Sequence, residues 1–153
     1  MRTPVFTGSC VAIATPFDAN GTINYDAFGR LIEAQIAGGV DAICVCGTTG
    51  ESATMTIREH IAAVDYCVEK VNHRVKVIAG AGSNDTSAAV YLSLHAQDSG
   101  ADALLHVTPY YNKCTQAGLV KHYEYIADRV ELPIIRYNVP SRTGIGIAPE
   151  TYV

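Results

Sequence analysis

Hydroxyl side chains collect directly after short apolar segments of this 153-residue sequence. Thr48 and Thr49 lie side by side between glycines, Tyr111 follows a proline-containing segment, and Tyr137 ends an apolar run. A chain of tyrosine and threonine hydroxyls can pass a proton from one group to the next. Arg142 can hold a carboxylate with two parallel hydrogen bonds. Together these residues indicate proton transfer on a small carbonyl compound that carries a carboxylate.

Five short apolar runs precede these polar segments. The runs are residues 9–14, 41–46, 75–79, 103–107 and 132–137. Each run is almost continuously apolar and rich in β-branched residues, which is typical of a parallel strand buried on both faces. Their centres recur about every 30 residues, the length of a strand-helix unit. The sequence therefore predicts repeated βα units.

Amphipathic stretches fill the intervals between the runs. Helices are expected around residues 28–36, 57–71, 86–99 and 119–130. Thr56 and Glu59 form a capping-box pattern at the start of the second stretch. Gly38 and Gly39 are placed to end the first one.

Two α/β architectures fit these units. An open doubly wound sheet of five strands would be complete at this length, whereas a closed (β/α)8 barrel needs eight units and about 250 residues. Polar residues follow every predicted strand at its carboxyl end, and a barrel uses all of these loops. An open sheet concentrates its site at one switch point. We therefore expect a (β/α)8 barrel truncated to about its first five units, with residues 1–153 as one incomplete domain.

Composition limits the partners of the chain. Apolar residues make up 48% and charged residues 17%, with a formal net charge of −4 and no run of like charges. This argues against disorder, nucleic-acid binding and binding to an anionic membrane. No apolar stretch approaches the ~20 residues of a membrane span, and no signal-peptide pattern is present. Five cysteines without a CxxC pair indicate reduced thiols in a cytoplasmic protein.

Several motifs have simpler interpretations than chemistry. The Gly80-x-Gly82 pair resembles a dinucleotide loop, but Asp85 stands where a third glycine is needed. Cys44 and Cys46 should share a strand face as packed core thiols, because no third ligand is near in sequence. The sequence thus predicts no cofactor and no metal. A turn followed by a helix cap would explain the residues around Thr48 and Thr49 as well as a site would.

The histidines and one arginine carry structural expectations. We expect His60 at a helix surface or interface, His122 in solvent, and His106 as a hydrogen-bonded structural residue in a strand. If Tyr137 faces the site, strand alternation turns Arg136 toward the helices, where an unpaired charge is costly.

Three motifs in combination identify a family resemblance. They are Gly47–Thr54 (GTTGESAT), Thr108–Asn112 (TPYYN) and Tyr137–Gly144 (YNVPSRTG). From about Phe6 onward the chain resembles the 4-hydroxy-tetrahydrodipicolinate synthase (dihydrodipicolinate synthase) family. The arginine in the third motif favours this family over the sialic-acid lyases and sugar-acid aldolases of the same superfamily. The resemblance implies a lyase of the diaminopimelate route to lysine, with a (β/α)8 barrel and a homotetrameric or homodimeric assembly.

The resemblance also implies roles for the hydroxyl residues and the arginine. In the family, pyruvate forms a Schiff base with a barrel lysine and then condenses with aspartate semialdehyde. Tyr137 is the implied acid/base, and Thr48 and Tyr111 complete the proton relay, with Tyr111 reaching in from a neighbouring subunit. Thr49 is implied to bind the pyruvate carboxylate and Arg142 the semialdehyde carboxylate.

The chain departs from the family at the Schiff-base lysine. The family places this lysine on the sixth strand, and the 153 residues stop at Val153, with Pro149 expected to open a further helix. None of the four lysines has the apolar strand environment that lowers a lysine pKa. We therefore predict that the 153-residue chain alone forms no Schiff base. Two alternatives stay open: another pyruvate-dependent aldolase or lyase, and a non-catalytic half-barrel that associates with a partner chain.

A site for feedback by lysine is implied at a dimer interface of the family. Its matching residues here are Ser52, Ala53, His60, Asn84 and Tyr110. Ile57 replaces a histidine of that site, and Ala88 replaces a glutamate. Because the carboxylate partner of the effector ammonium group is lost, we predict weak or absent inhibition by lysine.

Overall fold

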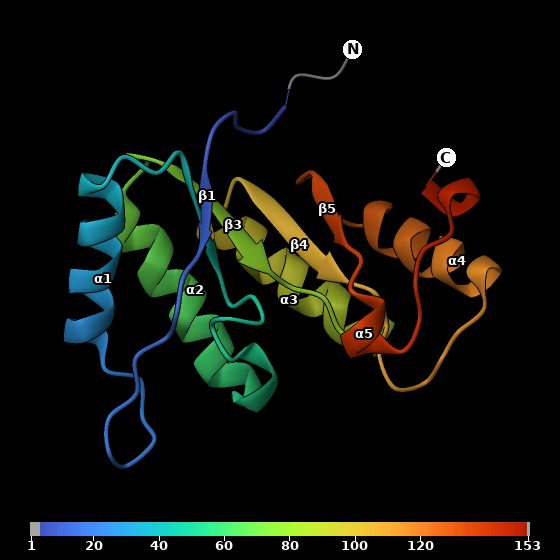
Figure 1. The fold of residues 1–153 in the computed structure, drawn as a ribbon, viewed down its shortest axis with the longest axis horizontal. Coiled ribbons are helices and arrows are strands. Elements are labelled where there is room, and N and C mark those ends of the chain that lie inside the picture. The colour runs from blue at the N-terminus through green and yellow to red at the C-terminus, as the bar shows by residue number, and fades with distance from the viewer. Residues whose placement is uncertain (1–3, 153) are drawn as a thin grey trace.

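The strands of the computed structural model, which describes residues 4–152, form one parallel five-stranded sheet (Figure 1). They are β1 (Cys10–Ala12), β2 (Ala42–Val45), β3 (Lys76–Gly80), β4 (Ala103–Val107) and β5 (Ile134–Tyr137). The helices are α1 (Tyr25–Ala37), α2 (Ile57–Val71), α3 (Thr86–Ser99), α4 (Gln116–Ala127) and the one-turn α5 (Pro140–Thr143). Two 3₁₀ helices, η1 (Ser52–Thr54) and η2 (Pro149–Tyr152), complete the element order.

The strands lie in the sheet in the order of the sequence, β1-β2-β3-β4-β5. A doubly wound sheet reverses its strand order at a switch point, whereas a barrel adds each strand beside the previous one. The observed order is therefore that of a barrel, as the loop residues predicted.

Side-chain caps explain where the helices begin. Glu59 N–H donates to the Thr56 hydroxyl at 3.3 Å, and Thr56 N–H donates to the Glu59 carboxylate at 2.8 Å, so the predicted capping box is confirmed. Asp85 accepts from the backbone N–H of Ser87 at the start of α3. Asp85 thus serves as an N-cap.

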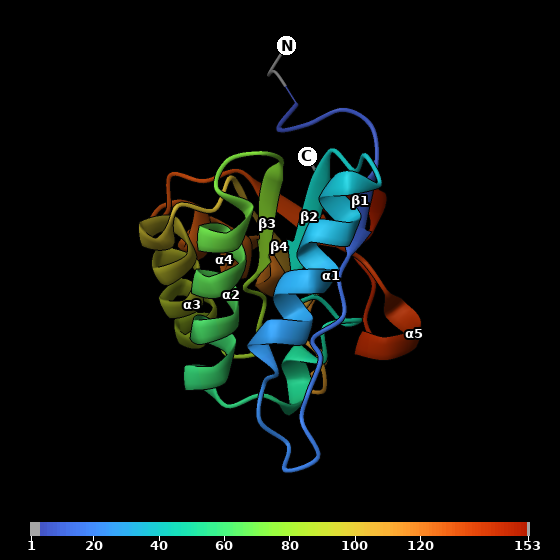
Figure 2. The same ribbon diagram turned by 90° about the vertical axis from the view of Figure 1, so that its left-hand side faces the viewer.

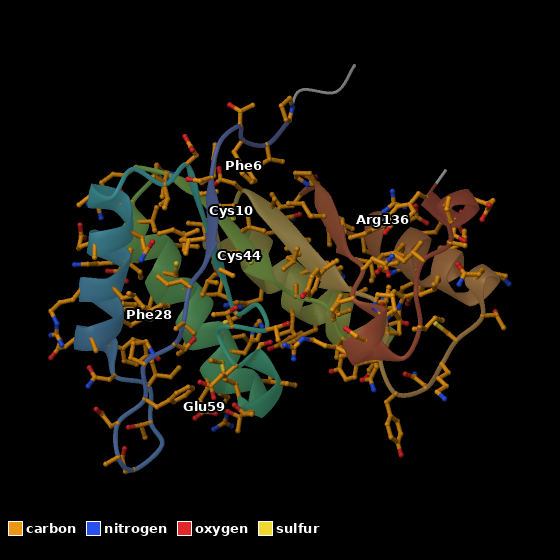
Figure 3. The ribbon with its side chains drawn as sticks, viewed as in Figure 1. Phe6, Cys10, Phe28, Cys44, Glu59 and Arg136 are labelled. Atoms are coloured by element: carbon orange, nitrogen blue, oxygen red, sulfur yellow. The ribbon has the colours of Figure 1, made fainter. Side chains whose placement is uncertain are left out.

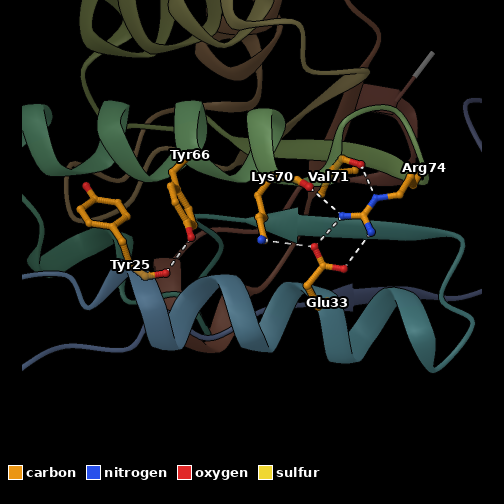
Figure 4. A network of polar contacts seen from close by, with 6 residues as sticks. All are labelled: Tyr25, Glu33, Tyr66, Lys70, Val71 and Arg74. Carbon is orange, nitrogen blue, oxygen red and sulfur yellow. Dashed lines mark hydrogen bonds and ion pairs between the residues drawn. The ribbon is translucent and has the colours of Figure 1, made fainter.

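A polar network joins α1 to α2 (Figure 4). Both guanidinium nitrogens Nη1 and Nη2 of Arg74 lie 2.8 Å from the Glu33 carboxylate, and Lys70 Nζ lies 3.5 Å from it. Tyr66 donates its hydroxyl to the Tyr25 carbonyl at 2.7 Å. The hydrogen bonds from Arg74 lower the Glu33 pKa to about 2. Such exposed pairs contribute little stability individually, but together they fix how the two helices lie.

The inner strands β2, β3 and β4 are largely buried, as their apolar runs predicted, whereas the outer strands β1 and β5 are partly exposed. Figure 2 shows α1, α2 and α3 side by side in front of the strands, and α4 packs against α3. The core on this face includes Phe28, Ile32, Ile43, Val45, Val64, Cys67, Val71 and Leu104. A smaller core of Ala42, Cys44, Ile78 and Ala103 lies on the opposite face, with Phe6 packed against it. Figure 3 shows Phe6, Cys10 and Cys44 close to one another along β1.

The expectation that Cys44 and Cys46 share a face is wrong. Cys46 follows the last residue of β2 and has a left-handed backbone with φ 54°. This turn moves its side chain into the helix-facing core, where the thiol donates to the His60 carbonyl at 3.7 Å. Cys44 belongs to the opposite face. Both thiols are packed core groups as predicted, and burial raises the pKa of each to about 12.

Two histidines are more buried than their helix positions predicted. His122 lies under the neighbouring α3, and a 2.8 Å hydrogen bond joins its Nδ1 to the Thr86 hydroxyl. His60 is also buried, on α2. The spacing of apolar residues shows which face of a single helix is buried. It does not show whether a neighbouring helix also covers the side of that face. His106 fits its prediction in part, because Nε2 lies 3.0 Å from the Ser93 hydroxyl but the buried Nδ1 has no hydrogen-bond partner among residues 4–152.

Arg136 is paired, contrary to the sequence expectation. Its Nη2 donates to the Tyr152 carbonyl at 3.1 Å, and its guanidinium lies 4.8 Å from the centre of the Tyr152 ring. Figure 3 shows Arg136 on the side of the sheet near the C-terminal turn. That turn, η2, is a 3₁₀ helix that begins at Pro149, where the sequence predicts the start of a helix.

Replacing Arg136 by leucine is expected to lower the melting temperature. The change removes one charged hydrogen bond and a cation–π contact at an exposed site, which together are worth about 1 kcal/mol. Thermal unfolding of the 153-residue chain followed by circular dichroism measures the effect. Arg136→Lys is the matched control, because it keeps the charge near the ring. A leucine variant that melts higher than the unsubstituted chain would contradict the pairing.

Candidate active site

A cleft of about 470 Å³ lies at the carboxyl end of the sheet. Figure 1 shows α5 and the segment that leads into α4 at this same end. The residues of the cleft with sequence-predicted roles are Thr48, Ser52, Ala53, His60, Tyr110, Tyr137 and Arg142. They come from segments that follow β2, β4 and β5 and from the first turns of α2. The expected convergence of loops at one end of the sheet is therefore confirmed.

The segment after β2 is a compact turn that presents Thr48. Gly50 N–H donates to the Gly47 carbonyl at 3.1 Å, and the buried Thr15 hydroxyl donates to the Gly50 carbonyl at 2.8 Å. Thr48 is exposed and lines the cleft. Thr49 is also exposed but is not part of the cleft wall. The predicted turn is therefore present, and it places Thr48 in the cleft wall, where the predicted site role requires it.

The end of β5 brings Tyr137 and Arg142 into the same cleft. Tyr137 is the last residue of the strand, and Arg142 lies on α5, in the single helical turn that follows. Gly144 ends this turn with φ 72°. The sequence placed Arg142 in a loop, and the helical turn replaces that loop.

The two neighbouring tyrosines of the third loop differ in position. Tyr110 lines the cleft, whereas Tyr111 is 90% exposed, with a left-handed φ of 73°, and lies outside the cleft wall. Within residues 4–152, no hydrogen bond links Thr48, Tyr111 and Tyr137. One chain therefore brings together two of the three hydroxyls of the predicted relay, and Tyr111 projects into the surroundings.

His60 contributes a buried polar atom to the cleft wall. Its Nδ1 has no hydrogen-bond partner among the described residues. Burial lowers the His60 pKa, and a contact with the Gly80 carbonyl opposes this shift. The free Nδ1 is therefore available for one hydrogen bond to a bound molecule.

Sequence reasoning gave no role to Thr143, which is buried and lines the cleft beside Arg142. Its hydroxyl lies 2.7 Å from the Ile145 carbonyl and 3.2 Å from the Val139 carbonyl. The only signal in the sequence is its place next to Arg142 in the third motif. Asn84 of the predicted effector set is not in the cleft wall, and its carbonyl accepts a hydrogen bond from Asn112 at 3.2 Å.

The Gly80-x-Gly82 pair serves close packing of strand ends. A Cβ atom on Gly80 would collide with the Cys46 carbonyl, and one on Gly82 would lie 2.5 Å from the backbone nitrogen of Val107. Both glycines therefore let the end of β3 pass against the backbones of its neighbours, β2 and β4.

Neither a metal-binding cluster nor a membrane-spanning helix occurs in the described part of the chain. Residues 4–152 contain no group of three or more His, Cys, Asp or Glu side chains that could hold a metal ion. Among the helices of the same residues, none has the length and apolar character that crossing a bilayer requires.

The sequence was compared with models of known protein families. Residues 5–153 match the model of the dihydrodipicolinate synthetase family. The chain belongs to this family. The resemblance drawn from the three sequence motifs is therefore confirmed.

Relatives of this family member are about twice its length. It is 59% identical over 151 residues to the 4-hydroxy-tetrahydrodipicolinate synthase of Acetivibrio thermocellus, an alignment that covers 99% of this chain and 51% of the relative. The dihydrodipicolinate synthase of Aquifex aeolicus superposes with a TM-score of 0.94 at 50% identity, covering 96% of this chain and 50% of that structure. The chain thus spans about half the length of the relatives it matches.

A further solved relative carries a ligand. The chloride-inhibited dihydrodipicolinate synthase from Acinetobacter baumannii, complexed with pyruvate, matches with a TM-score of 0.92 and 46% identity, over 94% of this chain and 50% of that one. These superpositions confirm the predicted fold class, a (β/α)8 barrel of which this family member forms five βα units.

None of the four lysines of this family member lines the cleft. Lys70 pairs with Glu33 on the helix layer, and Lys76 lies 2.7 Å from Asp102 at the amino end of β3. Lys113 and Lys121 are exposed. Among residues 4–152, which include every lysine of the chain, no lysine is part of the cleft wall.

Proposed function

We propose that this family member supplies the proton-transfer and carboxylate-binding half of a 4-hydroxy-tetrahydrodipicolinate synthase site. The observation that carries the proposal is the cleft in which Thr48, Tyr137 and Arg142 meet. The proposed reaction joins pyruvate to aspartate semialdehyde. It is a lyase reaction of lysine and diaminopimelate biosynthesis and takes place in the cytoplasm.

The proposed chemistry begins with a Schiff base between the carbonyl carbon of pyruvate and a lysine amine, with loss of water. The imine withdraws electrons and makes the pyruvate methyl group acidic. Loss of a methyl proton gives an enamine, whose carbon attacks the aldehyde of the second substrate while the new alkoxide takes up a proton. The amine of the semialdehyde then displaces the lysine amine, which closes the product ring and frees the lysine. The lysine comes from the sixth strand of the complete barrel, outside these 153 residues.

The described residues are assigned the remaining roles. Tyr137 transfers protons as the Schiff base forms, and Thr48 relays them. Thr49 binds the pyruvate carboxylate, and Arg142 binds the carboxylate of the semialdehyde. Tyr111 completes the relay of a neighbouring subunit, and its 90% exposure suits a residue that acts across an interface. The working assembly is a homotetramer or homodimer, and residues 1–153 form one incomplete barrel domain.

The test uses residues 1–153 joined to the remaining half of the A. thermocellus relative, referred to below as the joined chain. We expect it to convert pyruvate and aspartate semialdehyde, and to leave pyruvate with sugar-acid aldehydes unconverted. A folded joined chain that prefers sugar-acid aldehydes would assign the protein to another pyruvate-dependent aldolase. Size-exclusion chromatography and circular dichroism establish folding first.

A second candidate is a non-catalytic half-barrel that binds a partner chain. It is favoured by the absence of a lysine from the cleft wall described above. Under this alternative the joined chain folds and shows no activity with either class of aldehyde. The 153-residue chain then elutes as a stable complex with a separately expressed second half.

Lysine is expected to inhibit the joined chain weakly or not at all. Ile57 and Ala88 both line the cleft, and the described cleft wall contains no carboxylate to pair with an ammonium group. A titration of activity with lysine measures this. Ala88→Glu restores a carboxylate and is expected to raise sensitivity about tenfold, the effect of one charged hydrogen bond. Strong inhibition without that substitution would contradict the prediction.

A further inference from the structure

The side chain of Gln116 makes three hydrogen bonds to the segment that carries Arg142. Gln116 is the first residue of α4. Its Nε2 donates to the Gly146 carbonyl at 2.9 Å, and its Oε1 accepts from the Ala148 N–H at 2.9 Å and from the Thr151 hydroxyl at 2.7 Å. One half-buried amide therefore uses both its donor and its acceptor on one neighbouring segment.

The rest of this segment is held mainly by bonds within itself. Ile147 N–H donates to the Asn138 side chain at 3.1 Å, and the Thr143 hydroxyl bonds to the Ile145 carbonyl. Among residues 4–152, Gln116 is the one residue outside 138–151 that hydrogen-bonds to it. Ile145 and Ile147 add apolar packing against α4.

We infer that Gln116 is a positioning residue. It holds residues 138–151, the segment that contains α5 and Arg142, in a fixed position relative to the cleft. This inference rests on the proposed function, in which Arg142 binds the semialdehyde carboxylate. Gln116 does not line the cleft and so acts through the segment. Bidentate binding of a carboxylate needs a fixed guanidinium, so a loosened segment weakens one substrate selectively.

The chemistry of the site requires an amide at this position. The carboxylate of a glutamate has two acceptor oxygens and no N–H. One of these oxygens would lie against the Gly146 carbonyl oxygen, and the two acceptors would repel each other. Alanine removes all three bonds. Gln97 provides a matched control, because its Oε1 accepts from the Glu131 N–H at 2.7 Å and so holds the chain before β5, at the opposite end of that strand.

The test compares Gln116→Ala, Gln116→Glu and Gln97→Ala. In the 153-residue chain, amide hydrogen exchange at Ile147 and Ala148 is expected to be about tenfold faster in Gln116→Ala and unchanged in Gln97→Ala. Gln116→Glu keeps an acceptor for the Ala148 N–H and loses the bond to Gly146, so its exchange rates are expected to lie between these two. In the joined chain, KM for aspartate semialdehyde is expected to rise about tenfold, with kcat and KM for pyruvate within twofold. A merely structural role would not divide the two KM values in this way.

Exchange at Ile147 and Ala148 equal to that of Gln97→Ala would overturn the inference, as would KM values for both substrates that rise together. If the unsubstituted joined chain has no activity with aspartate semialdehyde, the proposed function fails. In that case the exchange rates alone decide whether Gln116 anchors the segment.

Discussion

Tyr137→Phe is expected to lower kcat of the joined chain by about 10²–10⁴-fold, the range for loss of a positioned acid/base group. Phenylalanine keeps the ring at the end of β5 and removes only the hydroxyl that lines the cleft. The measurement is the initial rate with pyruvate and aspartate semialdehyde at saturating concentrations of both. The lost hydroxyl slows the formation and breakdown of the Schiff base. Binding of the semialdehyde carboxylate by Arg142 is expected to be unchanged.

Tyr91→Phe is the matched control for this substitution. Tyr91 is 55% exposed on α3, outside the cleft wall, so its hydroxyl has no contact with substrate. Its variant is expected to retain the unsubstituted rate. A Tyr137→Phe variant within threefold of the unsubstituted rate would remove the acid/base assignment while leaving the family membership intact.

The 153-residue chain is expected to lose about 3 kcal/mol of unfolding free energy between pH 6.5 and pH 4 because of His106. Burial, with a smaller contribution from His122, lowers the His106 pKa from 6.5 to about 4. In this window the unfolded chain binds the proton and the folded chain does not. Stability is therefore retained above pH 6.5 and lost progressively as the pH falls toward 4.

Urea unfolding at a series of pH values measures this loss. His106→Gln is expected to be less stable at pH 7 but to show a flatter pH dependence, because glutamine does not titrate. The matched control is His73→Asn at an exposed position with a left-handed φ of 59°, which asparagine tolerates. His60 and His122 also have lowered pKa values, so some slope remains in the glutamine variant. An equal slope with and without His106 would contradict the assignment.

The regular parts of the fold were predictable because they follow local rules. Apolar runs located every strand, the pair Thr56 and Glu59 located the start of α2, and polar residues after each strand favoured a barrel. These signals depend on the spacing of neighbouring residues in the chain, which the sequence shows directly.

For some residues the surroundings predicted from the sequence were wrong. Their true surroundings depend on tertiary contacts or on a single backbone angle. His122 is covered by α3, and Arg136 pairs with Tyr152 because η2 folds back beside it. Cys46 leaves the expected strand face through one left-handed residue. In the site, the motif residues Thr48, Tyr137 and Arg142 were placed together correctly, but Gln116 has no motif of its own. Its inferred role follows only from the close approach of the first turn of α4 to residues 146–151.

Borohydride trapping with pyruvate tests the central claim most directly, namely that residues 1–153 hold half of the proposed site and that the Schiff-base lysine is not among them. Intact-mass and peptide analysis would be done on the 153-residue chain and on the joined chain. The account predicts no adduct on the first, and one adduct on the second, on a lysine of the relative's half. A stable adduct on Lys70, Lys76, Lys113 or Lys121, or a folded joined chain that traps no pyruvate, would contradict it.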